Sequence, residues 1–140
     1  MKRVLFVCIH NSARSQMAEA YLNHFGENHF LAESAGIEPG QLNPVVVEAM
    51  REDGIDISAN STHSVQQFIE EGREYDVLVT VCDETSAERC PRYPGIGKRL
   101  HFGFEDPSAM TGEVSEKLAR TRKIRDQIKS KIQEFIREQS

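Results

Sequence analysis

Strand-like and helix-like segments alternate along most of this chain of 140 residues. The first strand is expected at residues 4–7, an apolar run that suits burial on both faces. The first helix is expected to begin near Ser15 and to stop before Gly26. Such alternation predicts a doubly wound α/β fold, with about four parallel strands flanked by helices. Further strands are expected at 29–36, 75–82 and 98–104, and further helices at 44–54, 64–72 and from 113 onward.

The composition limits the classes of protein to which this chain can belong. Hydrophobic residues make up 39% of the chain and charged residues 28%, as in an ordinary globular protein, and the length suits a single domain at 1–140. The net charge of −5 argues against general nucleic-acid binding, which needs a basic surface. Because we find no long apolar run and no signal-peptide pattern, we expect a cytoplasmic protein without a membrane segment. A monomer is expected.

The segment between the first strand and the first helix carries a C-x5-R pattern, from Cys8 to Arg14. Backbone N–H groups at a helix start can point at one oxyanion, and the helix dipole adds positive charge there. Arg14 can bind a tetrahedral oxyanion with two parallel hydrogen bonds, while the same field favours the reactive thiolate of Cys8, which the Ser15 hydroxyl can hold. We therefore predict a nucleophilic cysteine, with a buried inert thiol as the alternative. The predicted oxyanion-binding loop is Ile9, His10, Asn11, Ser12, Ala13 and Arg14.

Other reactive groups are expected at the same edge of the sheet, because the carboxyl ends of parallel strands lie together. Cys82 ends the strand expected at 75–82, and Asp106 follows the strand expected at 98–104. An Asp–Pro pair is most often only a turn, but a carboxylic acid opposite a nucleophile can protonate a leaving oxygen. Cys90 follows Cys82 in a polar segment. Three cysteines leave open buried inert thiols, a metal site or redox chemistry.

Motifs along nearly the whole chain together resemble one family: VCIHNSARSQMAEA, SAGIEP, GIDIS, VTVCDETSAERCPRYPG and HFGFEDPS. They are similar to motifs of thioredoxin-coupled arsenate reductases, which share the fold of low-molecular-weight protein tyrosine phosphatases. The resemblance implies a four-stranded parallel sheet, a catalytic Cys8, an oxyanion loop that ends at Ser15 and a general acid at Asp106. It also implies redox roles for Cys82 and Cys90.

On this interpretation the substrate is arsenate, phosphate is a competing oxyanion, and thioredoxin is the electron donor. Reduction of arsenic(V) takes two electrons, which a pair of thiols can supply. Cys8 attacks arsenate while Asp106 helps hydroxide leave, and Cys82 then attacks Cys8 and releases arsenite. Cys90 finally attacks Cys82, so that thioredoxin can reduce the disulfide between them. No tightly bound cofactor is expected.

Departures from the family patterns also bear on the function. One residue more than usual separates the two later cysteines, which a polar loop tolerates. RSQ at 14–16 stands where phosphatases of this fold carry RSP, and Ser108 and Ala109 stand where they carry tyrosines. The last two departures favour the reductase.

Two rival functions remain open. The first is a low-molecular-weight protein tyrosine phosphatase, which would hydrolyse phosphate monoesters through a phosphate intermediate on Cys8. The second is a zinc-binding or redox-sensing module that uses Cys82, Cys90 and His101, although these cysteines lie further apart than in a usual zinc site and no fourth ligand is evident.

A monovalent cation could bind near Asn11. Some reductases of the family hold a potassium ion, and Asn11, Glu19 and Ser34 resemble three of its ligands. The acidic fourth ligand is missing from NSTHSV at 60–65, so we do not assume that the ion binds.

Overall fold

The structure, a computed structural model, describes residues 1–81 and 93–139. Within these residues, four parallel strands form one sheet in the order β2-β1-β3-β4. The strands are β1 (Lys2–Cys8), β2 (Phe30–Gly36), β3 (Val77–Thr80) and β4 (Lys98–His101). The helices are α1 (Arg14–Phe25), α2 (Pro44–Glu52), α3 (Val65–Glu70) and α5 (Val114–Gln139), with a short 3-10 turn, η1 (Pro107–Ala109). The predicted four-stranded α/β fold is confirmed.

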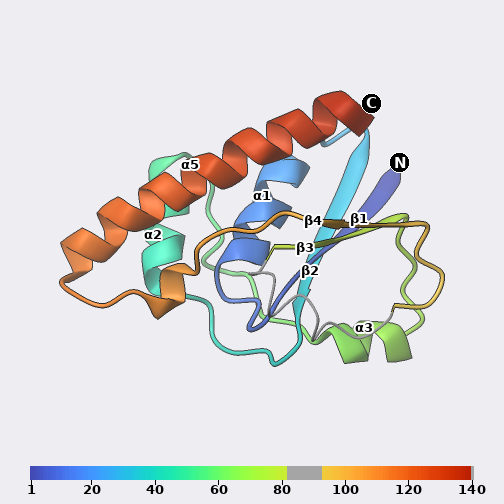
Figure 1. The fold of residues 1–140 in the computed structure, drawn as a ribbon, viewed down its shortest axis with the longest axis horizontal. Coiled ribbons are helices and arrows are strands. Elements are labelled where there is room, and N and C mark those ends of the chain that lie inside the picture. The colour runs from blue at the N-terminus through green and yellow to red at the C-terminus, as the bar shows by residue number, and fades with distance from the viewer. Residues whose placement is uncertain (82–92, 140) are drawn as a thin grey trace.

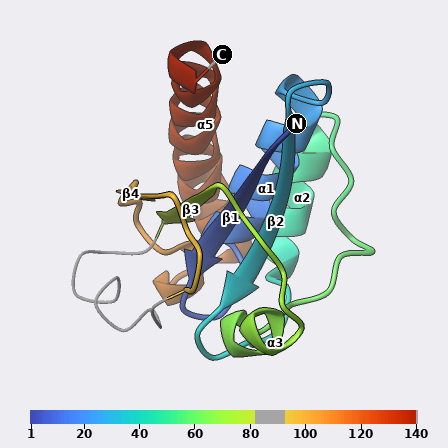
Figure 2. The same cartoon turned by 90° about the vertical axis from the view of Figure 1, so that its right-hand side faces the viewer.

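Helices cover both faces of the sheet, α1, α2 and α5 on one face and α3 on the other (Figure 1 and Figure 2). Because successive side chains of a strand point to opposite faces, β1 contributes to both layers of the core. Val4 and Phe6 belong to the cluster formed with α1, α2 and α5, whereas Leu5 and Val7 pack with α3. All four side chains are fully buried. The apolar run at 4–7 therefore forms the two-sided central strand that the sequence predicts.

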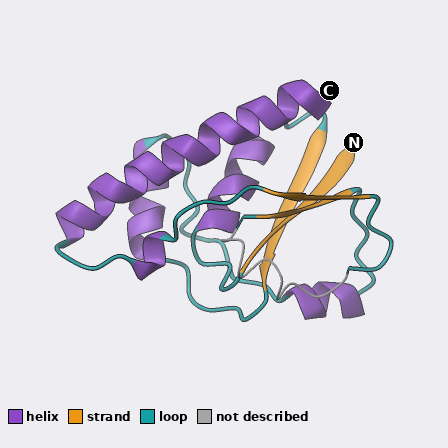
Figure 3. Cartoon of the chain, in the orientation of Figure 1, coloured by secondary structure: helices purple, strands orange, loops and turns teal. Residues whose placement is uncertain are grey.

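The long helix α5 crosses the outer side of α1 and α2 (Figure 3). Its buried side chains recur every three or four positions: Ile124, Ile128, Ile132 and Phe135. The remaining faces of the helix are charged, which fits a surface helix with one apolar stripe. Among the described residues, no helix is both long and apolar enough to cross a membrane.

Two strands are shorter than the sequence predicts. β3 begins at Val77, two residues after the expected start, and the expected end at residue 82 lies outside the described residues. β4 ends at His101 instead of Phe104, because it is an edge strand whose neighbour β3 itself ends at Thr80.

The strand order places the carboxyl end of β1 at the point where the topology reverses. From β1 the chain passes through α1 to β2 on one side, and later returns to β3 on the other side. Ligands of doubly wound sheets bind at such a point, beyond the carboxyl ends of the strands. The loop between Cys8 and Arg14 lies there.

Candidate active site

The carbonyl groups of the loop after β1 are bound by the segment between β2 and α2. In a trans peptide, a carbonyl and the N–H that follows it point in opposite directions. The N–H groups that follow these carbonyls therefore point away from residues 37–43. The four hydrogen bonds run from the N–H groups of Ile37, Glu38, Gly40 and Asn43 to the carbonyls of Cys8 (3.1 Å), Ile9 (2.7 Å), His10 (2.9 Å) and Ser12 (3.0 Å), respectively.

Gly36, the last residue of β2, makes this close packing possible. A Cβ atom at Gly36 would lie 2.8 Å from the carbonyl oxygen of Ile9 and 2.9 Å from the nitrogen of Asn11. Both atoms belong to the backbone, so neither can move aside cheaply. The end of β2 and the loop therefore approach each other at a distance that only glycine allows.

The thiol of Cys8 lies buried among hydrogen-bonding groups. Its sulfur is 3.0 Å from the hydroxyl oxygen of Ser15, and the N–H of Asn11 donates to it over 3.2 Å. The side-chain amide of Asn11 donates in turn to the Ser15 hydroxyl oxygen (2.7 Å), which leaves the hydroxyl proton free to face the sulfur. These hydrogen bonds hold the sulfur of Cys8 in place at the base of the loop.

Asn11 holds the loop in an unusual backbone conformation. Its φ of 55° lies in the left-handed region, which asparagine adopts more readily than most residues. Its buried side-chain oxygen accepts a hydrogen bond from the N–H of His63 (2.9 Å), which ties the loop to the chain just before α3. The conformation is thus secured from outside the loop.

Arg14 and Asp106 come together across the loop. The guanidinium of Arg14 is buried, donates to the carbonyl of Phe104 (3.1 Å) and lies 3.5 Å from a carboxylate oxygen of Asp106. The other carboxylate oxygen accepts from the N–H of Ser108 (2.9 Å), so Asp106 also caps η1. The Asp–Pro pair therefore forms a turn, as such pairs usually do, and it also places the carboxylate of Asp106 beside the loop. A buried thiol, loop N–H groups that point away from residues 37–43, a guanidinium and a carboxylate lie at one end of the sheet.

A model of the low molecular weight phosphotyrosine protein phosphatases matches residues 3–139. The chain belongs to this phosphatase family. The family description alone does not separate a phosphatase from a reductase, because both resemble this chain in the loop and the fold.

Relatives of this chain within the phosphatase family include arsenate reductases. The arsenate reductase of Bacillus subtilis is 40% identical over 134 residues, which cover 96% of this chain and 94% of that protein. A solved arsenate reductase in its oxidized state superposes with a TM-score of 0.80 at 30% identity, covering all of both chains. A thioredoxin-dependent arsenate reductase of Corynebacterium glutamicum has a TM-score of 0.63 at 28% identity, over 95% of this chain and 62% of that one.

Cys82 and Cys90, two of the predicted site residues, lie outside the described residues. The structure describes the chain as far as Val81. Val81 donates its N–H to the carbonyl of Val7 (2.9 Å), which continues the pairing of β3 with β1 as far as the position next to Cys8. Cys82 is the next residue along the chain.

The side chains of Asn11, Glu19 and Ser34 do not fit a monovalent cation. The Ser34 hydroxyl donates to a carboxylate oxygen of Glu19 (3.0 Å), and the Asn11 side-chain oxygen already accepts from His63. Residues 60–65 supply no carboxylate. Burial is the main reason why the pKa of Glu19 rises from 4.5 to about 7, and it outweighs the opposing hydrogen bond from Ser34.

His101, a ligand in the zinc hypothesis, lies at the end of β4. One of its ring nitrogens lies 2.7 Å from the hydroxyl of Thr80, and its side chain is exposed. Residues 1–81 and 93–139 contain no group of three or more potential metal ligands, and the cysteines of that hypothesis lie outside these ranges.

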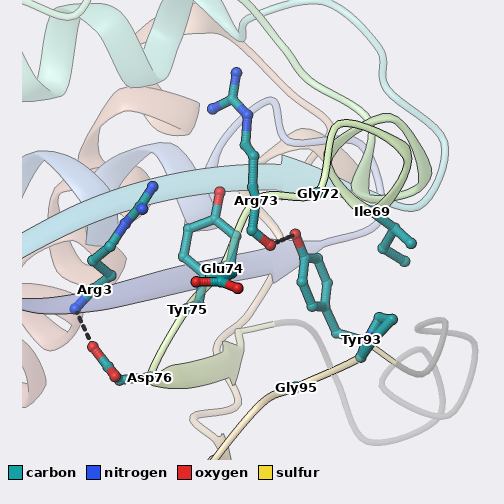
Figure 4. Close-up of a pocket in the computed structure, with 10 residues that line it drawn as sticks. Arg3, Ile69, Gly72, Arg73, Glu74, Tyr75, Asp76, Tyr93 and Gly95 are labelled. Carbon is teal, nitrogen blue, oxygen red and sulfur yellow. Dashed lines mark hydrogen bonds between the residues drawn. The ribbon is translucent and has the colours of Figure 1, made fainter.

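A pocket of about 570 Å³ lies at the opposite end of the strands, near Arg3 and Asp76 (Figure 4). Its two guanidiniums, those of Arg3 and Arg73, both pair with Glu33. The hydroxyl of Tyr93 donates to the carbonyl of Arg73 (2.6 Å), as the dashed line in Figure 4 shows. This pocket therefore lies away from the loop after β1, and its two cations are both engaged by one carboxylate.

Three residues that support the loop were not predicted from the sequence: Gly36, His63 and Gln16. The glycine at the end of the strand predicted at 29–36 was the available signal for Gly36. The other two residues reach the loop through contacts made in the folded chain, for which the sequence carried no local pattern.

Proposed function

We propose that this protein reduces arsenate to arsenite through a relay of three cysteines that thioredoxin recycles. The position of Val81 beside Cys8 carries the proposal. Val81 continues the pairing of β3 with β1 and lies next to Cys8 across the two strands, and Cys82 follows Val81 directly in the sequence. We therefore assign to Cys82 the thiol that attacks Cys8.

The relatives support the same choice. Arsenate reductases match this chain over nearly its full length at 40% identity, and one similar structure is that of a thioredoxin-dependent enzyme. A phosphatase mechanism would need only Cys8, Arg14 and Asp106. It would give no reason for cysteines at positions 82 and 90.

In the first step, the thiolate of Cys8 attacks the arsenic atom of arsenate. Arg14 and the backbone N–H groups of the loop stabilise the negative oxygens, whose charge increases in the transition state. Asp106 donates a proton to the leaving oxygen, which departs as water. The product is a bond between the sulfur of Cys8 and arsenic(V).

In the second step, the thiolate of Cys82 attacks the sulfur of Cys8. The sulfur–arsenic bond breaks, its electron pair stays with arsenic, and arsenic(III) leaves as arsenite. Two thiols have then lost two electrons and arsenic has gained two. Cys90 next attacks Cys82, releases Cys8 as a thiolate and leaves a disulfide that the thioredoxin dithiol reduces.

Hydrolysis of phosphate monoesters is the second candidate, because the oxyanion site serves both reactions. The family to which the chain belongs is described by such a phosphatase activity. In that reaction Cys8 forms a phosphate intermediate that water hydrolyses, with no electron transfer. We expect slow hydrolysis of aryl phosphates even if reduction is the main activity.

The deciding experiment measures arsenate-dependent oxidation of NADPH in the presence of thioredoxin and thioredoxin reductase. The wild type should consume NADPH and produce arsenite. Cys8→Ser should abolish both arsenite production and aryl phosphate hydrolysis while the protein remains folded. Cys82→Ser should abolish arsenite production alone. Arsenite production by either variant at the wild-type rate would refute the relay.

A further inference from the structure

The carbonyl of Asn11 is held differently from its neighbours in the loop. Four other loop carbonyls accept hydrogen bonds from backbone N–H groups of residues 37–43. The Asn11 carbonyl instead accepts from the side-chain amide of Gln16 (3.1 Å), in the first turn of α1. One peptide of the loop therefore depends on a side chain for its orientation.

Gln16 is buried and bonded at both ends of its amide. Besides the Asn11 carbonyl, its nitrogen lies 3.3 Å from the side-chain oxygen of Asn11 and 3.1 Å from the carbonyl of Ser61. Its oxygen accepts from the side-chain amide of Asn60 (3.1 Å). These contacts fix the position of the amide from a separate part of the chain, and they leave it little freedom to release the loop.

From this geometry we infer that Gln16 is a positioning residue, which turns the N–H of Ser12 toward the bound oxyanion. The carbonyl of Asn11 and the N–H of Ser12 belong to one planar trans peptide, so they point in opposite directions. A donor that holds the carbonyl on the side of Ser61 consequently directs the Ser12 N–H to the other side. On this other side, the N–H of Asn11 donates a hydrogen bond to the sulfur of Cys8.

The left-handed conformation of Asn11 makes such a restraint valuable. A peptide next to a residue with φ of 55° has an alternative orientation, with its carbonyl and N–H exchanged. In that orientation a carbonyl oxygen would face the oxyanion and repel it. Gln16 removes this alternative before the oxyanion binds.

The inference depends on the proposed function only in that the loop binds an oxyanion. The test compares the dissociation constants of inorganic phosphate for the wild type, for Gln16→Met and for Gln67→Met. Methionine has a similar length but offers no donor. Gln67 is exposed on α3, and within the described part of the chain its side chain bonds only Glu71, so Gln67→Met is a matched control.

We expect Gln16→Met to bind phosphate roughly tenfold more weakly. Without the amide of Gln16, the Ser12 N–H is no longer held toward the anion, and the phosphate loses one hydrogen bond to a charged group. Gln67→Met should bind as the wild type does. Alkylation of Cys8 by uncharged iodoacetamide, followed by mass spectrometry of the Cys8 peptide, should proceed in Gln16→Met at the wild-type rate. A general collapse of the site would change both measurements.

A second measurement needs no variant. In amide NMR spectra of the wild type, saturation with phosphate should move the Ser12 proton resonance downfield. No movement at Ser12, or equal phosphate affinity of Gln16→Met and the wild type, would overturn the inference while leaving the proposed function intact. A wild type that binds no oxyanion would overturn both.

Discussion

Arg14 is oriented by two contacts from the segment after β4, the carbonyl of Phe104 and the carboxylate of Asp106. Lysine at this position would keep the charge but lose the planar fork that matches two oxygens of a tetrahedral anion. We expect Arg14→Lys to lower the rate of arsenite production by on the order of 100-fold. Arg51→Lys, at an exposed arginine of α2, is the matched control and should leave the rate unchanged. Near-normal kinetics of Arg14→Lys would show that the arginine has a structural role only.

Glu19 should make the stability of the protein depend on pH. Its pKa is about 7 in the folded protein against 4.5 as the ordinary value, so the folded state holds the proton more tightly than the unfolded state. The free energy of unfolding should therefore fall as pH rises from about 4.5 to about 7. In Glu19→Gln, which keeps an oxygen to accept from Ser34, this contribution should disappear.

Urea unfolding at several pH values measures the effect. Across this window, the wild type should lose up to about 3 kcal/mol relative to Glu19→Gln. Glu70→Gln, at an exposed residue of α3, should follow the wild type. Parallel curves for the wild type and Glu19→Gln would contradict the prediction.

At the scale of elements, the end of β2 supports the loop after β1. Gly36→Ala would force a Cβ atom within 2.9 Å of backbone atoms of Ile9 and Asn11, so the strand and the loop must separate. We expect a loss of stability of about 1–3 kcal/mol, measured by thermal unfolding, and phosphate affinity lower by more than tenfold. Gly40→Ala is the control, because its Cβ would lie at an ordinary 3.4 Å from the side chain of His10. Similar affinities of the two variants would show that the close packing at Gly36 is not needed for binding.

At the scale of the whole molecule, the relay joins positions that are far apart in the sequence. If Cys90 only resolves the first disulfide, Cys90→Ser should release about one arsenite per enzyme and then stop, because Cys8 and Cys82 suffice for that step. Mass spectrometry should find the disulfide between Cys8 and Cys82 in the arsenate-treated variant, and that between Cys82 and Cys90 in the wild type without thioredoxin. Continuous turnover of Cys90→Ser with thioredoxin would show that the relay ends at Cys82.

The sequence predicted those features of the molecule that depend on local pattern. The apolar run at 4–7 and the periodic buried residues of α5 identify a two-sided strand and a one-sided helix, and the alternation of elements implies parallel strands. The end of β4 was placed too far out, because the end of an edge strand depends on its neighbour. The support of the loop by Gly36 and Gln16 could not be predicted, because it depends on contacts between residues up to 45 positions apart.

The hydrogen bonds from residues 37–43 limit how far the loop can be treated as a portable motif. Residues 8–15 alone, transplanted onto another α/β protein, would carry the cysteine and the arginine but not the N–H groups that turn the loop carbonyls outward. For the same reason, a protease that cuts between β2 and α2 should abolish oxyanion binding, although every residue of the C-x5-R pattern would remain intact. The transferable unit is the loop together with the connection that supports it.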